Sequence, residues 1–123
     1  MFIGFMKLIE DYAGKGFAPN ALDFLYNEKE IVKVRIVSYP QKDEKRVDAI
    51  IRQYNYFSLL HPMEYSNVVC CIEYSMLNPL IMSEKQVLRD MVGGLNHWDK
   101  MLVGTAIDNR LYGKLLMTLI CSR

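Results

Sequence analysis

The chain has 123 residues, the usual size of one domain, and 51% of its residues are apolar. This composition excludes a disordered chain, because disordered chains lack enough apolar surface to offset the entropy of ordering. The net charge of +1 argues against duplex DNA as a partner, since proteins that bind DNA usually carry a marked excess of positive charge.

The cysteine count and the apolar stretches bear on location and on domain organisation. Three cysteines are an odd number, whereas small secreted domains are usually held by several disulfides, so we expect a reducing compartment and a cytoplasmic protein. No apolar stretch reaches the roughly 18 residues that a membrane-spanning helix needs. No linker or repeat divides the sequence, so residues 1–123 are expected to form a single globular domain.

The first third of the chain predicts two helices and a strand. Apolar residues recur at steps of three and four over residues 2–13, which is typical of a helix, and the glycines of residues 14–16 end it. A short second helix is expected over residues 20–28, with Asn20 as its N-cap. Residues 31–37 alternate β-branched and basic side chains, and this is the clearest strand pattern in the sequence.

The rest of the chain predicts further helices. Apolar spacing indicates a helix over about residues 43–60, and a capping-box pattern opens another over residues 83–93. A short helical turn is expected over residues 96–102. The apolar residues of 111–120 also recur at steps of three and four, so a terminal helix is expected there.

The segment Val68-Val69-Cys70-Cys71-Ile72-Glu73-Tyr74 is ambiguous, because so short an apolar run fits a strand or a helix. As a strand it would follow residues 31–37 through a helical crossover and lie beside them in parallel. We therefore predict a mainly α, single compact domain of about five to six helices. It would have at most a small two-stranded sheet, formed by 31–37 and possibly 68–74. The alternative is an α+β fold.

The adjacent cysteines raise the question of reactive or metal chemistry. Neighbouring side chains point to opposite faces of a strand and diverge by about 100° on a helix, so Cys70 and Cys71 are a poor pair for one metal ion. Their apolar surroundings favour burial, which raises the pKa of a thiol. An enzyme in which the fold brings one of them to His61 or His97 remains the third alternative. We expect no metal and no cofactor.

The absence of catalytic motifs favours a binding role. No phosphate-loop, serine-hydrolase or zinc-protease pattern appears, so we expect a protein that is not an enzyme. The leading hypothesis is a protein-binding domain, such as an inhibitor or immunity-type antidote that neutralises a toxin or nuclease by forming a tight complex. Residues 1–30 hold three lysines against five acidic residues, which suits a basic partner. The expected partner-binding residues are Glu10, Asp11, Asp23, Glu28, Glu30, Tyr56, Tyr65 and Glu73.

The runner-up is a small nucleic-acid-binding or regulatory module that uses residues 31–60. This segment holds six basic and three acidic residues, and Tyr54, Tyr56 and Phe57 lie near its end. Aromatic rings beside cations suit single strands. These cations are also expected on the solvent-exposed faces of an ordinary strand and helix, so nucleic acid is not the preferred partner.

Overall fold

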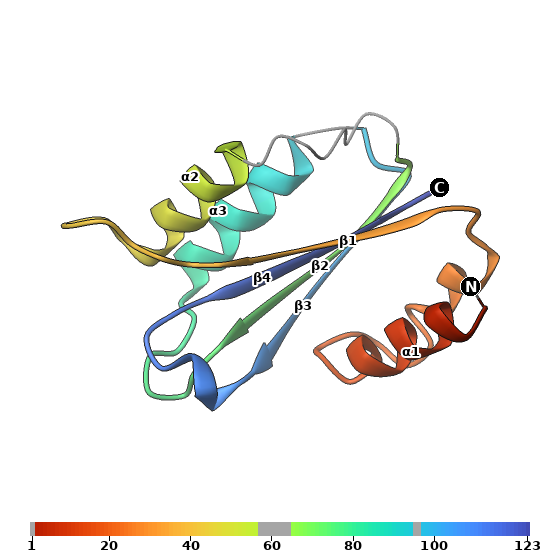
Figure 1. Cartoon of the computed structure of the whole chain (residues 1–123), viewed down its shortest axis with the longest axis horizontal. Coiled ribbons are helices and arrows are strands. Elements are labelled where there is room, and N and C mark those ends of the chain that lie inside the picture. Colours follow the sequence, from red (N-terminus) through yellow and green to blue (C-terminus); the bar gives the residue numbers. More distant parts are fainter. Residues whose placement is uncertain (1, 57–64, 95–96) are drawn as a thin grey trace.

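The computed structural model shows a four-stranded mixed sheet with helices on both faces (Figure 1). It describes residues 2–56, 65–94 and 97–123. The strands are β1 (Ile31–Val37), β2 (Asn67–Tyr74), β3 (Lys100–Ile107) and β4 (Leu116–Ser122). Their order in the sheet is β1–β4–β2–β3, with β4 antiparallel to both of its neighbours and β2 parallel to β3.

The helices lie in two layers (Figure 1). Helices α2 (Arg46–Tyr56) and α3 (Met82–Gly93) cover one face of the sheet, whereas α1 (Phe2–Ala13) and the short 3-10 helix η1 (Asp23–Asn27) cover the other. Another 3-10 helix of the described residues, η3 (Asn109–Leu111), lies in the connection from β3 to β4. The sheet is therefore the middle layer of three.

Several predicted elements are confirmed. The structure has the predicted helix over residues 2–13 and the predicted strand over 31–37. The helix predicted over 43–60 is described from Arg46 to Tyr56, and its expected last residues lie outside the described ranges. The helix predicted over 83–93 begins one residue earlier, at Met82.

Strand β4 contradicts the expected terminal helix over residues 111–120. It lies between β1 and β2, and all seven of its residues are buried. A strand that is covered on both faces is apolar at nearly every position, so its sequence is a continuous apolar run instead of an alternation. Such a run also contains steps of three and four, which is why spacing alone predicts the wrong element here.

Strand β3 contradicts the helical turn expected over residues 96–102. From Lys100 onward the chain is extended, and its side chains alternate between the two faces of the sheet. Met101 and Val103 pack in the cluster beneath α2 and α3, and Leu102 packs in the cluster beneath α1. The period is therefore two, as in any strand that lies between two layers.

These two strands overturn the predicted fold class. The described residues contain three α-helices around a four-stranded sheet, so the fold is α+β and not a mainly helical domain of five to six helices. The expected pairing of residues 31–37 with residues 68–74 is also wrong. Both strands run in the same direction, but β4 lies between them, and Leu119 faces Val34 on one side and Cys70 on the other.

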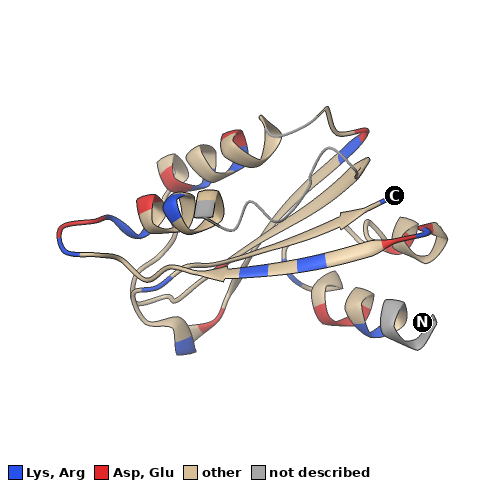
Figure 2. Ribbon diagram, turned by 45° about the horizontal axis from the view of Figure 1, so that its top comes forward, with Lys and Arg blue, Asp and Glu red and all other residues tan. Residues whose placement is uncertain are grey.

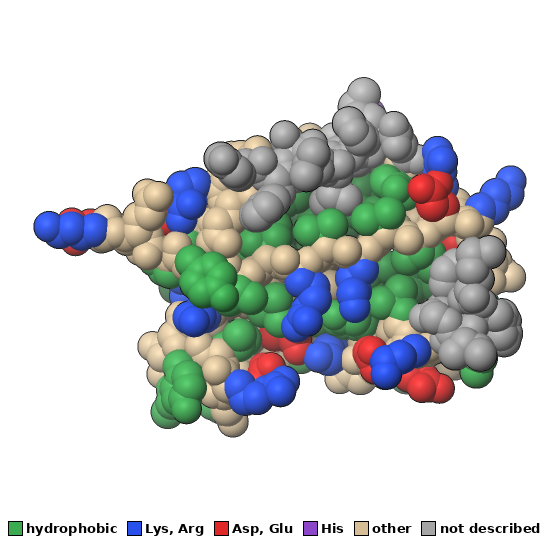
Figure 3. Space-filling model, in the orientation of Figure 1, with side chains coloured by type: hydrophobic (Ala, Val, Ile, Leu, Met, Phe, Trp, Pro, Cys, Tyr) green, Lys and Arg blue, Asp and Glu red, His purple; other side chains and the backbone are tan. Residues whose placement is uncertain are grey.

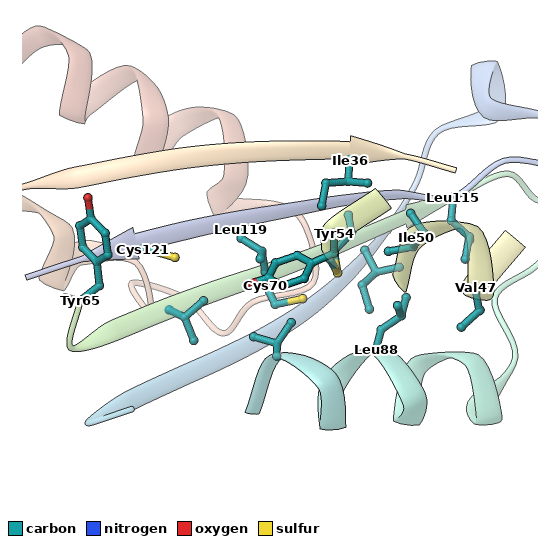
Figure 4. Packing of buried hydrophobic residues seen from close by; sticks show 14 residues of the cluster. Ile36, Val47, Ile50, Tyr54, Tyr65, Cys70, Leu88, Leu115, Leu119 and Cys121 are labelled. Carbon is teal, nitrogen blue, oxygen red and sulfur yellow. The ribbon is translucent and has the colours of Figure 1, made fainter. Parts of the chain in front are cut away.

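The adjacent cysteines lie in two different cores. Cys70 faces the cluster beneath α2 and α3, where it lies near Tyr54 and Leu88 (Figure 4), whereas Cys71 faces the cluster that holds Tyr12. Both are completely buried. Burial is the main cause that raises the pKa of each thiol to about 12. The two sulfurs therefore point away from each other and stay protonated near neutral pH.

We expect no thiol of the folded chain to react with iodoacetamide at neutral pH. Cys121 is also buried, and burial raises its pKa to about 11, so the reactive thiolate is scarce at all three positions. Mass spectrometry of the alkylated protein should find three modified cysteines in denaturant and none without it. Rapid labelling of Cys70 or Cys71 in the folded protein would contradict this and would revive the hypothesis of a cysteine enzyme.

Candidate protein-binding surface

Large apolar side chains are exposed at one end of the sheet. Strands β2 and β3 are parallel, so their carboxyl ends meet there, and the connection from β2 to α3 leaves from the same place. Seven of the ten large hydrophobic side chains that are exposed in the described residues come from this region. They are Met76, Leu77, Ile81, Met82, Val87, Ile107 and Tyr112, and we call them the apolar end. Figure 3 shows hydrophobic side chains at the lower left of the molecule, near the end of β3 in Figure 1.

Hydrogen bonds hold the two loops of the apolar end together. The backbone N–H of Met76 donates to the side-chain oxygen of Asn109 at 3.0 Å. The side chain of Asn78 donates to the carbonyl oxygen of Tyr112 at 3.3 Å. These bonds join the β2–α3 connection to the β3–β4 connection, so the apolar side chains project from a fixed backbone.

Arg46, at the start of α2, fixes the same connection from the other side. Its guanidinium donates to the carbonyl oxygens of Asn78 and Pro79 at 2.8 and 2.9 Å. It also donates to both carboxylate oxygens of Glu84 in a fork, at 2.8 and 2.7 Å. Glu84 in turn accepts the backbone N–H of Ile81 at 3.1 Å, so the first turn of α3 is held in place. The Arg46 guanidinium lowers the pKa of Glu84 below its usual value.

Two hollows lie beside Ile81, which lines both. The larger, of about 410 Å³, lies between the first turns of α2 and α3 and is lined in part by Val47 and Val87. The smaller, of about 110 Å³, is lined in part by Tyr74 and Leu80. Ile81 is thus an exposed apolar ridge between two concave sites that are partly apolar.

Two of the acidic residues that were expected to bind a partner, Glu28 and Glu30, instead bind other residues of this chain. Glu28 accepts hydrogen bonds from the side chains of Asn67 and Ser122. Glu30 forms an ion pair with Arg123 at 2.6 Å. Glu28 thereby fastens the segment before β1 to β2 and β4, and Glu30 fastens it to Arg123, which follows β4.

Glu73 is also engaged internally, on the α1 side of β2. It is only 3% exposed, and its carboxylate accepts a hydrogen bond from Lys15 Nζ at 2.6 Å. Lys15 belongs to the loop that follows α1, and this loop crosses β3 very closely. A Cβ atom on Gly104 would lie 2.6 Å from the carbonyl oxygen of Lys15, so only glycine fits there.

The remaining expected residues are spread over the molecule. Glu10, Asp11 and Asp23 are exposed on α1 and η1, away from the apolar end (Figure 2). Tyr65 is only 8% exposed, and its hydroxyl donates to Glu30. The side chain of Tyr56 lies outside the described residues. The structure therefore does not gather the expected set into one surface.

The sequence did contain a signal for the apolar end. Residues 76–82, with the sequence MLNPLIM, are mostly apolar although Asn78 and Pro79 mark a turn. Apolar side chains in a turn have no inward face to occupy, and so many of them remain exposed. Periodicity detects helices and strands, so it gives no weight to such a segment.

The structure also bears on the two alternative hypotheses. Of the cations in residues 31–60, Arg46 and Arg52 form internal ion pairs, whereas Lys33 and Arg35 are exposed on β1 (Figure 2). Within the ranges that the structure describes, no group of three or more His, Cys, Asp and Glu side chains could hold a metal ion. His97 is exposed, and His61 lies outside these ranges. None of the described helices is long and apolar enough to cross a membrane.

Comparisons with known proteins show the fold alone. No protein-family model and no curated protein matches the chain. Among solved structures it is similar to FtsZ of M. jannaschii, described as an empty dimer, with a TM-score of 0.69, 14% identity, 94% of this chain covered and 34% of that chain. A tryptophan-to-tyrosine mutant of FtsZ from M. jannaschii gives a TM-score of 0.70 at 14% identity, with 94% and 36% covered.

The chain thus spans about a third of the length of these FtsZ chains. At 14% identity the likeness extends to the arrangement of strands and helices, and it agrees with the α+β fold against the helical one. These structures give no support to the expected inhibitor or immunity role.

Replacing Arg46 by alanine should destabilise the fold by about 2 kcal/mol, because Glu84 and two carbonyl oxygens lose their shared donor. The folded-state pKa of Glu84 is lowered, so its ion pair stabilises the protein above the ordinary carboxyl pKa and is lost as the pH falls through the folded-state value. Urea unfolding at neutral and acidic pH should show that Arg46→Ala removes the part of the unfolding free energy that the wild type loses on acidification through this ion pair. Arg89→Ala, at an exposed position of α3, is the matched control, and equal losses in both variants would contradict the assignment.

Replacing Lys15 by methionine should cost about 3 kcal/mol, since it leaves Glu73 buried without its cation. The hydrogen bond from Lys15 to Glu73 raises the pKa of the lysine. The Lys15–Glu73 ion pair therefore contributes fully to the free energy of unfolding below the unfolded-state pKa of the lysine. This contribution is lost as the pH rises through the raised, folded-state pKa. Urea unfolding between neutral and alkaline pH should show this loss in the wild type and not in Lys15→Met. Lys7→Met, on the exposed part of α1, should behave like the wild type; an equal effect there would refute the prediction.

Proposed function

We propose that this chain is a non-catalytic protein-binding domain and that the apolar end is its contact surface. One observation carries the proposal: seven large apolar side chains are exposed together, four of them on loops that are held by side-chain hydrogen bonds and the other three on the adjoining β3 and α3. Exposed apolar groups of this kind, beside polar residues, are typical of sites where another protein binds.

The energetics favour binding at this surface. Fully burying one such side chain contributes about 1.5–3 kcal/mol, and Leu77, Met82 and Tyr112 are each more than two-thirds exposed. Ordering a flexible loop on binding costs free energy, and a loop that is already fixed avoids most of that cost. The bonds from Arg46 therefore support binding as well as folding. The proposal is in keeping with the FtsZ neighbour that is described as a dimer, since that protein associates with another chain.

A cytoplasmic location is part of the proposal. Cys70, Cys71 and Cys121 are free thiols in the structure, and Cys70 and Cys71 point to opposite faces of β2. A reducing compartment keeps such thiols unpaired.

The proposal is tested by substituting the ridge. The double variant Ile81→Asp with Met82→Asp places two charges on the apolar end, and both positions are exposed, so folding should be retained. Proteins captured from the native extract by the immobilised wild-type chain should be lost from this variant, with an affinity decrease of at least about tenfold. Circular dichroism and thermal unfolding confirm that the variant is folded.

Met6→Asp is the matched control, because Met6 is an exposed methionine on α1 outside the apolar end. It should capture the same proteins as the wild type. Capture that survives in the ridge variant, or that is lost equally in Met6→Asp, would show that the apolar end is not the contact surface.

A further inference from the structure

We infer that the partner offers an acidic amphipathic segment, whose apolar side chains fill the two hollows beside Ile81 and whose carboxylates face the lysines around them. The inference rests on the proposed function and names the chemistry of its partner. It follows from three features of the apolar end: its shape, the charges at its rim and the ionic state of its acidic residues.

The shape favours protein side chains over a flat surface. Ile81 separates a hollow of about 410 Å³ from one of about 110 Å³, so an occupant must present at least two apolar groups, one on each side of the ridge. A single amphipathic segment does this with side chains a few residues apart. A lipid surface is flat on this scale and would contact the exposed ridge while leaving the hollows unfilled.

The rim has a surplus of positive charge. Lys45 lines the larger hollow and Lys85 the smaller. Lys114 lines neither hollow, but it lies in the β3–β4 connection that also carries Tyr112 of the apolar end, with its ammonium group 4.9 Å from the centre of the Tyr39 ring. No carboxylate of the described residues forms an ion pair with any of these three lysines. The amino end of α3 adds partial positive charge at the same place.

The acidic residues near the hollows are mostly neutralised. Glu84 is paired with Arg46 at 2.7 Å, and Asp108 is paired with Arg110 at 2.9 Å. Asp48 is the remaining acid of the larger hollow, beside Lys45. The field at the apolar end therefore attracts negative charge, and charge complementarity selects an acidic occupant.

The acidic partner inferred here has the opposite charge to the basic partner that the acidic residues of 1–30 suggested. A basic partner would meet three lysines that form no ion pair with the described carboxylates, which is repulsive. The exposed acids Glu10 and Asp11 lie on α1, on the other side of the sheet. The apolar and the acidic surfaces are therefore separate, and the partner of the apolar end is an acidic segment.

The test is selection from a random peptide display library on the folded chain, with the Ile81→Asp, Met82→Asp variant used to remove peptides that bind elsewhere. The enriched sequences should combine apolar residues with an excess of Asp and Glu. A synthetic copy of the consensus peptide, labelled with fluorescein, then gives Kd by anisotropy. Its Kd should rise as salt is added, since Lys45 and Lys114 are exposed and Lys85 is partly exposed to solvent, where salt screens their charges.

Charge reversal distinguishes the role of the rim from the role of the ridge. The double variant Lys45→Glu with Lys85→Glu should raise the Kd of the acidic peptide by about tenfold. A peptide with Lys in place of its Asp and Glu should bind this variant with the affinity that the acidic peptide has for the wild type. Lys7→Glu, an exposed reversal on α1, should leave Kd unchanged. The acidic partner would be refuted if the enriched peptides were neutral or basic, or if the Kd of an acidic peptide did not change in the Lys45→Glu, Lys85→Glu variant. Either result would leave the ridge as a protein-binding surface.

Other occupants give different results. Co-sedimentation with vesicles of phosphatidylserine and phosphatidylcholine that is lost in the ridge variant would assign the surface to a membrane. A dimer in sedimentation equilibrium that is lost in the same variant would assign it to a second copy. Failure to enrich any peptide would also overturn the inference. If the immobilised wild-type chain captured no protein from the native extract, the proposed function itself would be refuted.

Discussion

The fold depends on the pairing of β4 with both β1 and β2. This last strand joins β1, on one side, to the parallel pair β2 and β3, on the other. Leu119 lies between Val34 and Cys70, which are far from it in sequence. The sheet is therefore continuous only when the C-terminal segment is in place, and such non-local pairing is entropically costly to form. The position of β4 also explains why helices cover both faces, because a central apolar strand needs a layer on each side.

The central position of β4 also determines which elements of the fold could be predicted from the sequence. The edge strand β1 shows alternation, because Lys33 and Arg35 are exposed while Ile36 is buried, and this pattern is unambiguous. The central strand β4 is buried on both faces and carries no charged residue, so no exposed polar positions mark a period of two. A helix with an apolar stripe on one face, such as α1, remains recognisable, whereas the segment that organises the sheet is the one that spacing misassigns.

The apolar end, the proposed partner surface, was missed for a related reason. Formal charges along a sequence do not show which acids are already paired, and Glu73 and Glu30 find Lys15 and Arg123 through long-range contacts. These two acidic residues, which looked available in the sequence, thus already have partners within the chain. The apolar end, in contrast, combines side chains of two connections with side chains of β3 and α3, and these converge because β2 and β3 are parallel and end together.

Arg46 gives a physical reason to regard that convergence as a binding surface. A turn that only connected β2 to α3 would need neither a mostly buried guanidinium nor exposed apolar side chains. Arg46 and Glu84 expose about 15% of their side chains, so both charges lose hydration, and this cost is offset only by the complete set of bonds between them and the loop carbonyls. The result is a stiff loop whose apolar residues face solvent. Stiffness without an apolar surface would serve stability, and an apolar surface without stiffness would bind poorly; the two occur together here.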